Sequence, residues 1–280
     1  MRTWTLYGSM ARQALNKILG FRCLLVMVMF FFTLDMFLRP LREYAVANRE
    51  ATSPSVLAFL IAHNYFQKMI LLAVIYFYSN VPFLEKQEQY YFQRLGRRRF
   101  CIRGFFYILI SGFWLSAALW GLSLLDMAPC VRFTRSWDRL SKTLALTSAG
   151  TELQLHFGIF YRAIENFTPL ELCLYSFVTL ALCCSMVGML MYAFCLLFHR
   201  VAAVSAASVV AMLPDIMTRP RAWTYPVYLS PVSWVGCDSW RSGYDVEKPD
   251  FVYIFVAYGF LLFLFGALSL WRSKRIEYTG

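Results

Sequence analysis

Six long runs of apolar residues, separated by shorter polar segments, dominate this chain of 280 residues. They cover residues 18–38, 56–79, 105–125, 169–198, 201–216 and 251–271. A bilayer core about 30 Å thick needs roughly 20 mostly apolar residues in a helix, and most of the runs reach that length. Inside lipid every backbone polar group must pair within its own segment, so each run is predicted to be a helix. The pattern predicts an all-α integral membrane protein with six transmembrane helices.

The second run differs from the others because it contains a group of polar residues. His63, Asn64, Gln67 and Lys68 lie within it, and positions 64, 67 and 68 share one helical face. Polar side chains at membrane depth turn toward the bundle interior or a wet cavity. Together with Asp35 of the first run, they are candidates for lining a path. The alternative is an ion pair, such as Asp35 with Lys68, that only joins two helices.

The fourth and fifth runs differ from the others in length. The fourth is long enough to tilt or to extend past the membrane surface. The fifth is short, is rich in alanine and serine, and ends at Pro214 and Asp215. Small residues let helix backbones approach closely, so the fifth run is predicted to be a tightly packed inner helix.

Composition agrees with a membrane protein and leaves room for a single domain, residues 1–280. The chain is 59% hydrophobic with a mean hydropathy of +0.52, whereas soluble domains are about 45–50% apolar. A soluble core helix would explain one such run but not six. The net charge of +11 would suit a nucleic-acid partner in another setting. In a chain this apolar, membrane topology explains the excess of basic residues better. We therefore expect no nucleic-acid partner.

The distribution of basic residues predicts that both termini are cytoplasmic, in a multi-pass protein of the plasma membrane. Short cytoplasmic loops near helix ends are enriched in lysine and arginine. The segments that would then be inside are 1–22, 84–103, 199–200 and 272–280. Their basic residues are Arg2, Arg12, Lys17, Arg22, Lys86, Arg94, Arg97, Arg98, Arg99, Arg103, Arg200, Arg272, Lys274 and Arg275, against the acids Glu85, Glu88 and Glu277.

The first run is expected to stay as a spanning helix. It is longer than the apolar core of a signal peptide, and no small-residue cleavage site follows it. The preceding residues 4–19 mix aromatic and aliphatic side chains with Arg12 and Lys17. That mixture is typical of an amphipathic helix lying in the inner interface.

Two long segments, 127–168 and 217–249, are predicted to lie outside. In the first, residues 137–146 combine Trp137, Leu140 and Leu144 with a basic face, which favours a surface helix. The second is rich in aromatic residues and proline. Either it forms an aromatic belt at the interface or it dips into the membrane. Each segment holds one cysteine, Cys130 and Cys237, and sequence leaves a disulfide between them open because it gives no distance.

No catalytic or cofactor motif is present. The chain lacks a phosphate-binding G-x-x-x-x-G-K-[ST] loop, an H-E-x-x-H and a G-x-S-x-G sequence. The histidines His63, His156 and His199 are far apart in sequence and form no ligand pair. We therefore expect no enzyme activity and no cofactor or metal on this chain.

The inner loop after the second run has the most specific pattern. Pro82 ends the run, and residues 84–96 form a short amphipathic segment that stops at Gly96 before Arg97, Arg98 and Arg99. A short helix between two spanning helices, projecting into the cytoplasm, is predicted to dock a soluble partner. Its candidate contact residues are Glu85, Glu88, Tyr91, Arg94 and Leu95.

With these features the chain resembles the permease subunits of type-2 ABC exporters. Members have an interfacial N-terminal helix, six spans, and a cytoplasmic coupling helix after the second span that begins with acidic residues and ends in a turn and basic residues. Residues 198–201 resemble the family's short inner turn, 228–234 its outer, partly re-entrant segment, and 274–276 its basic tail. The outer loop 127–168 is longer than the family's usual one.

The resemblance implies a transport subunit driven by a separate ATPase, which would carry the ATP and Mg. It also implies a second permease copy or paralogue. A non-transporting accessory, immunity or sensor protein is the alternative. A secondary transporter is disfavoured because the six runs show no internal repeat.

Overall fold

The computed structural model describes residues 20–80, 97–134, 136–147, 149–217, 226–241 and 248–273. About 79% of the structure is helical, and none of the described residues forms a strand. The candidate interfacial helix 4–19 and the candidate coupling helix 84–96 lie outside the described residues.

The helices differ widely in length. The bounds are α2 Phe21–Asn48, α3 Val56–Ile61, α4 Asn64–Tyr78, α6 Arg97–Asp126, α7 Arg139–Leu146, α8 Ala149–Glu152, α9 Tyr161–Asn166, α10 Pro169–Leu197, α11 Arg200–Met217, α12 Pro226–Leu229 and α13 Phe251–Ser273. Two 3-10 turns, Ser233–Val235 and Cys237–Ser239, follow α12.

Within the part of the chain that the structure describes, four helices are long and apolar enough to cross a membrane. They are Phe21–Asn48, Arg98–Asp126, Pro169–Leu197 and Phe251–Arg272, within α2, α6, α10 and α13. The chain therefore has the character of an all-α, membrane-embedded protein. The second and fifth apolar runs give α3 with α4 and α11, which are not among these four.

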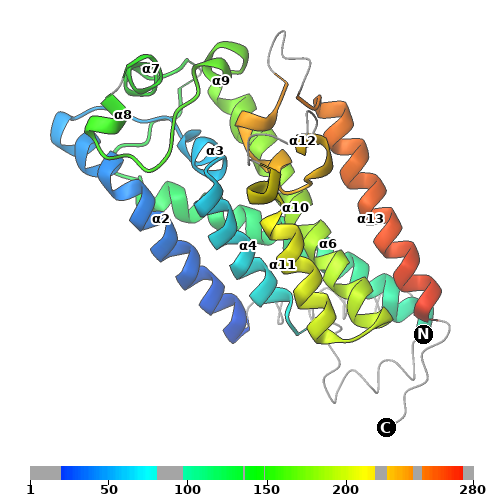
Figure 1. Ribbon diagram of the computed structural model, residues 1–280. Helices are drawn as coiled ribbons and strands as arrows, with labels where there is room; N and C mark the ends of the chain where they lie inside the picture. The colour runs from blue at the N-terminus through cyan, green and yellow to red at the C-terminus, as the bar shows by residue number, and fades with distance from the viewer. Residues whose placement is uncertain are drawn as a thin grey trace, which may run out of the picture.

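The long helices run between two ends of the molecule (Figure 1). The start of α2, the end of α4, the start of α6, the turn between α10 and α11, and the end of α13 lie toward the lower end in this view. The short helices α7, α8, α9 and α12 lie toward the opposite end. Every long helix therefore begins at the end where its predecessor stopped.

Helix α10 is the central helix of the bundle. It packs against α6, α11 and α13, and 72% of its most apolar stretch is buried, against 17% for α13. Its start is fixed by a capping box: the Thr168 hydroxyl accepts from the Glu171 N–H, and the Glu171 carboxylate accepts from the Thr168 N–H. Pro169 suits the first helical position, because the N–H that proline lacks would have no partner within the helix there.

The inner helix is α10 rather than α11, which corrects the expectation for the fifth run. The small face of α11 does pack closely, since Ala203, Ala207 and Ala211 are buried. Val201 and Val209 on its other side are exposed. Small residues predict a close contact on the face that carries them. They do not predict that other helices cover the remaining faces.

Helices α6 and α10 approach each other closely at Gly112. A Cβ atom at this position would lie 2.1 Å from the Ser185 Oγ, 2.9 Å from the Ser185 N and 3.0 Å from the Ala181 O. Two of these three atoms belong to the backbone of α10. The contact therefore needs a residue without a side chain, as is common where membrane helices pack.

Two helices extend beyond the apolar runs that predict them. Helix α2 continues to Asn48 instead of ending near residue 38, and α6 begins at Arg97 instead of residue 105. Hydropathy marks only the apolar part of a helix, whereas backbone hydrogen bonding continues through charged turns. In α2 the pair of Asp35 and Arg39, four residues apart, supports this continuation.

The outer segment 127–168 folds over the end of the bundle. The surface helix expected at residues 137–146 is present as α7. The Asp138 carboxylate caps its start by accepting from the Ser141 N–H, and Leu140 and Leu144 are buried beneath it. Cys130 and Cys237 are both buried and both free, so the disulfide left open by the sequence does not form.

Candidate functional site

The second apolar run is broken into two helices, and the break is the main departure from a simple bundle. Helix α3 ends at Ile61, and α4 begins at Asn64. Ala62 and His63 lie between them. All six residues of α3 are buried, which suits a segment that is apolar on every face.

The segment 226–241 packs directly against this break. The Gln67 side chain donates a hydrogen bond to the Val232 carbonyl at 2.8 Å, and the Cys237 thiol donates to the Ala58 carbonyl at 3.6 Å. A Cβ atom on Gly236 would lie 3.0 Å from the Ala62 Cα, so glycine allows the two backbones to approach. The segment 226–241 thus covers one side of the break, while Ala62 and His63 themselves stay partly exposed.

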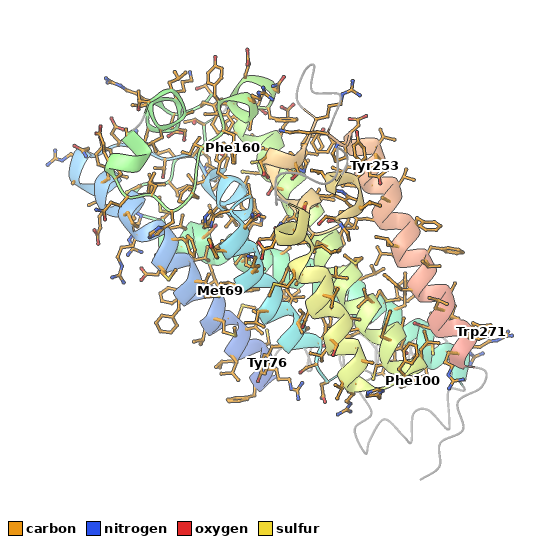
Figure 2. The ribbon with its side chains drawn as sticks, in the orientation of Figure 1. Met69, Tyr76, Phe100, Phe160, Tyr253 and Trp271 are labelled. Carbon is orange, nitrogen blue, oxygen red and sulfur yellow. The ribbon has the colours of Figure 1, made fainter. Side chains whose placement is uncertain are left out.

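Aromatic side chains hold the segment 226–241 in place. The Trp234 indole donates to the Val227 carbonyl and the Trp240 indole to the Trp234 carbonyl. The Tyr258 hydroxyl of α13 donates to the Pro231 carbonyl. Tyr253, at the upper end of α13 in Figure 2, donates to the Tyr228 carbonyl. Both tryptophans are buried in the protein, which argues against a simple belt at the lipid surface.

Asp238 is the carboxylic acid of the segment 226–241. It lies in the second 3-10 turn, between the buried residues Cys237 and Ser239. Burial raises the pKa of its carboxyl group to about 6, against the lowering effects of local backbone hydrogen bonds and of Lys248. This acid therefore titrates close to physiological pH.

Beside the break, a cavity of about 580 Å³ opens between α2, α4 and α11. Most of its wall is apolar: Met36 and Phe37 come from α2, Met69, Leu72 and Ile75 from α4, and Ala211 and Met212 from α11. Its volume lies within the range of about 300–1,000 Å³ typical of small-molecule sites. Met69, on the α4 wall, is labelled in Figure 2.

Two histidines and a lysine give the cavity a polar end. The rings of His63 and His156 lie 5.5 Å and 5.8 Å from the ring of Phe37, measured between centroids. The buried Nδ1 atom of His63 has no hydrogen-bond partner among the described residues. The fold therefore brings His63 and His156 to one cavity, although they are far apart in sequence.

Lys68 lines the same cavity and forms an ion pair across it. Its Nζ atom lies 2.5 Å from the Asp215 carboxylate of α11 and 4.9 Å from the centroid of the Tyr65 ring. The pair that the sequence analysis considered, Asp35 with Lys68, does not form. The general idea of an ion pair joining two helices holds, with Asp215 in place of Asp35.

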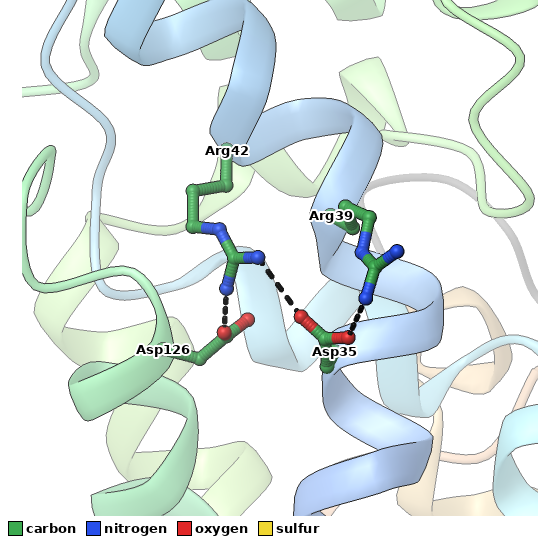
Figure 3. Close-up of polar contacts among 4 residues, drawn as sticks. All are labelled: Asp35, Arg39, Arg42 and Asp126. Atoms are coloured by element: carbon green, nitrogen blue, oxygen red, sulfur yellow. Dashed lines mark hydrogen bonds and ion pairs between the residues drawn. The ribbon is translucent and has the colours of Figure 1, made fainter.

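Asp35 belongs to a separate ionic network between α2 and α6 (Figure 3). Its carboxylate contacts Arg39 at 2.5 Å and Arg42 at 2.9 Å, and Arg42 also pairs with Asp126 at the end of α6. The Asp126 side chain is 2% exposed, and its Oδ2 atom has no partner among the described residues. The network thus ties α2 to α6 with two cations and two anions.

The structure divides the candidate path-lining residues into three groups. His63 and Lys68 line the cavity. Gln67 is buried and satisfies the backbone of residues 226–241, while Asn64 is partly buried and is not part of the cavity wall. Asp35 lies in the network with α6.

Sequence reasoning missed two residues of the site, His156 and Asp215. The sequence does indicate Asp215, because an acidic residue within an apolar run needs a partner at membrane depth. No sequence pattern indicates His156, since it comes from the irregular segment between α8 and α9. The docking candidates Glu85, Glu88, Tyr91, Arg94 and Leu95 lie outside the described residues.

Among the described residues, no group of three or more histidine, cysteine, aspartate or glutamate side chains has the geometry of a metal site. Comparison of the chain with family models, with curated proteins and with solved structures finds no match.

Proposed function

We propose that this chain is the membrane-spanning subunit of an ATP-driven exporter of the type-2 ABC class. The observation that supports it most is the broken second helix, whose break faces a cavity with ionisable side chains. Interrupted helices at membrane depth are typical of transporters, where the free backbone lines a path or is buried in protein. A helix that only anchors a protein has no need of such a break.

The lengths of the helices support six crossings. At 1.5 Å per residue, α3 and α4 together span roughly 34 Å and α11 roughly 27 Å, close to the thickness of a bilayer core. With α2, α6, α10 and α13, they give six segments that run between the two ends of the molecule (Figure 1). The second and fifth carry polar residues because they line the path.

The orientation follows from the basic side chains at the lower end. Arg22 at the start of α2, Arg98 and Arg103 in the first turns of α6, Arg200 at the start of α11 and Arg272 at the end of α13 all come from elements that meet there. By the positive-inside rule this end is cytoplasmic. Both termini then lie inside, and the plasma membrane is the location.

A separate ATPase would supply the energy. It would bind ATP and Mg and dock on the segment 84–96 through Glu85, Glu88, Tyr91, Arg94 and Leu95. A second copy of the permease, or a paralogue, would complete the path. Docking at one inner helix shifts the conformational equilibrium when the ATPase binds one state more tightly than the other.

Co-purification with an ATPase encoded by a neighbouring gene tests the proposal. We expect the unmodified chain to retain the ATPase and the double variant Glu85→Lys/Glu88→Lys to lose it. Glu277→Lys is the matched control, since it makes the same charge reversal in the basic C-terminal tail and should leave binding unchanged. If no ATPase co-purifies with the unmodified chain, the accessory, immunity or sensor alternative is favoured.

A further inference from the structure

We propose that the cavity between α2, α4 and α11 binds an amphipathic anion, meaning an acidic head group on a single alkyl chain. The inference rests on the proposed function for the claim that this ligand is a transport substrate. Binding itself needs only this chain. The two ends of the cavity differ in chemistry: one is basic and the other is apolar.

The head group would lie at the end formed by His63, Lys68 and His156. None of the described residues in the cavity wall is acidic, so the side chains that face a ligand there are cationic or can donate a hydrogen bond. Asp215 pairs with Lys68 but does not line the cavity. The Nδ1 atom of His63 is buried without a partner among the described residues, and a turn of the ring toward the cavity would let it pair with an acidic head group.

The alkyl chain would lie along α4, away from the basic end. Met69, Leu72 and Ile75 follow Lys68 on the cavity side of this helix, and Met36 and Met212 face them from α2 and α11. From His63 to Ile75 the helix rises roughly 18 Å, enough for an extended alkyl chain. Methionine side chains are flexible and polarizable, so they adapt to chains of different length.

Charge complementarity favours this ligand over the other occupants of an apolar groove. A neutral lipid, or the apolar face of a second copy, would leave the His63 Nδ1 atom unsatisfied, while Asp215 already serves as the counter-charge of Lys68. An amphipathic cation would place its charge beside Lys68. An acidic head group satisfies the histidines and can compete with Asp215 for the lysine.

The test is photolabelling of the full-length chain in neutral phosphatidylcholine nanodiscs with a diazirine analogue of hexadecanoic acid. We expect labels on peptides of α4 or α11. Hexadecanoate and hexadecyl phosphate should compete, which would show that the acidic head is recognised, while hexadecanol and hexadecyltrimethylammonium should not. Equal competition by all four compounds would overturn the proposal, because it would show simple partitioning into an apolar groove.

The two halves of the ion pair give variants with opposite expected effects. Lys68→Gln should weaken competition by hexadecanoate about tenfold, the usual effect of losing one charged hydrogen bond. Asp215→Asn should strengthen it, because Lys68 is then released to the ligand. If the pair were only structural, both variants would weaken binding, and that result would contradict the proposal.

A size variant tests the position of the alkyl chain. Met212→Trp places a bulky ring in the cavity and should abolish specific labelling. Val256→Trp, on the exposed side of α13 and outside the cavity wall, should preserve it. If light scattering shows a stable dimer whose interface excludes the probe from this groove, the face belongs to a second copy and the proposal is wrong.

The binding assay contains no ATPase and no ATP, so the two proposals can fail separately. Selective labelling without ATPase co-purification would support the anion site and count against the exporter. ATPase co-purification without selective labelling would support the exporter and overturn the anion site.

Discussion

Single charged residues carry much of the tertiary organisation of this protein, and Arg42 has the most consequential position. It bridges Asp35 of its own helix and Asp126 at the end of α6. Arg39 also contacts Asp35, but its side chain is 58% exposed. Two arginines less than one turn apart therefore have very different roles, one joining two helices and the other lying at the surface.

We expect Arg42→Met to destabilise the protein strongly. It leaves the buried Asp126 carboxylate without its counter-charge, a change that usually costs about 3–5 kcal/mol. Arg39→Met, at an exposed and solvent-screened pair, should cost far less. Thermal unfolding in detergent, followed by tryptophan fluorescence, measures both. Similar losses in the two variants would show that Arg42 does not bridge the helices in solution, and adding Asp126→Asn to Arg42→Met should recover part of the loss.

Asp238 gives the protein a predictable dependence on pH. Its folded-state pKa of about 6 lies above the ordinary 3.8, so between these values the folded state binds more protons than the unfolded state. Its contribution to the free energy of unfolding therefore falls as pH rises from about 4 to about 6, by at most about 3 kcal/mol, and then stays constant.

Thermal unfolding of Asp238→Asn across this range checks the prediction. The variant should be more stable than the unmodified chain at pH 7.5 and should show a smaller decline in melting temperature between pH 4 and pH 6. If the two proteins show the same pH profile, Asp238 is not the group that titrates.

At the scale of elements, two glycines of α6 allow a matched comparison. Gly112→Ala would bring a methyl group within 3.0 Å of the α10 backbone, so the helices must separate, at a cost of about 1–3 kcal/mol. A methyl group at Gly121 would meet no atom within 4 Å. There the substitution should stabilise the helix by about 0.4–1 kcal/mol, because the unfolded chain loses conformational freedom. Melting temperatures in detergent should move in opposite directions, and equal shifts would argue against the packing of α6 on α10.

The elements also show how far sequence reasoning reaches. The runs at 169–198 and 251–271 match α10 and α13 closely, since Pro169 marks one start and unbroken hydropathy fills both. The run at 56–79 gave no sign of its break, because Ala62 and His63 are compatible with a helix. The break exists because the segment 226–241 contacts Ala62 and bonds to Gln67, and hydropathy does not report contacts across that distance in sequence.

At the scale of the whole molecule, the proposed topology makes a prediction about sidedness. Alkaline phosphatase fused after Asp138 should be active, because this outer segment would lie outside the membrane. A fusion after Gln89 should be inactive, whereas green fluorescent protein at the same site and at Gly280 should fluoresce. Activity after Gln89 would mean that this loop lies outside, and the proposed topology would be wrong.

The sequence by itself determined the all-helical, membrane-embedded class, because an apolar run of sufficient length in lipid has few alternatives to a helix. It also placed α7, α10, α11 and α13 to within a few residues and showed which polar residues at membrane depth needed a partner. Only the tertiary structure decided their partners: Lys68 pairs with Asp215, Asp35 with Arg39 and Arg42, and His63 meets His156 beside a cavity. The reason is physical, since burial makes a partner necessary, but helix packing alone determines which residue is close enough to serve.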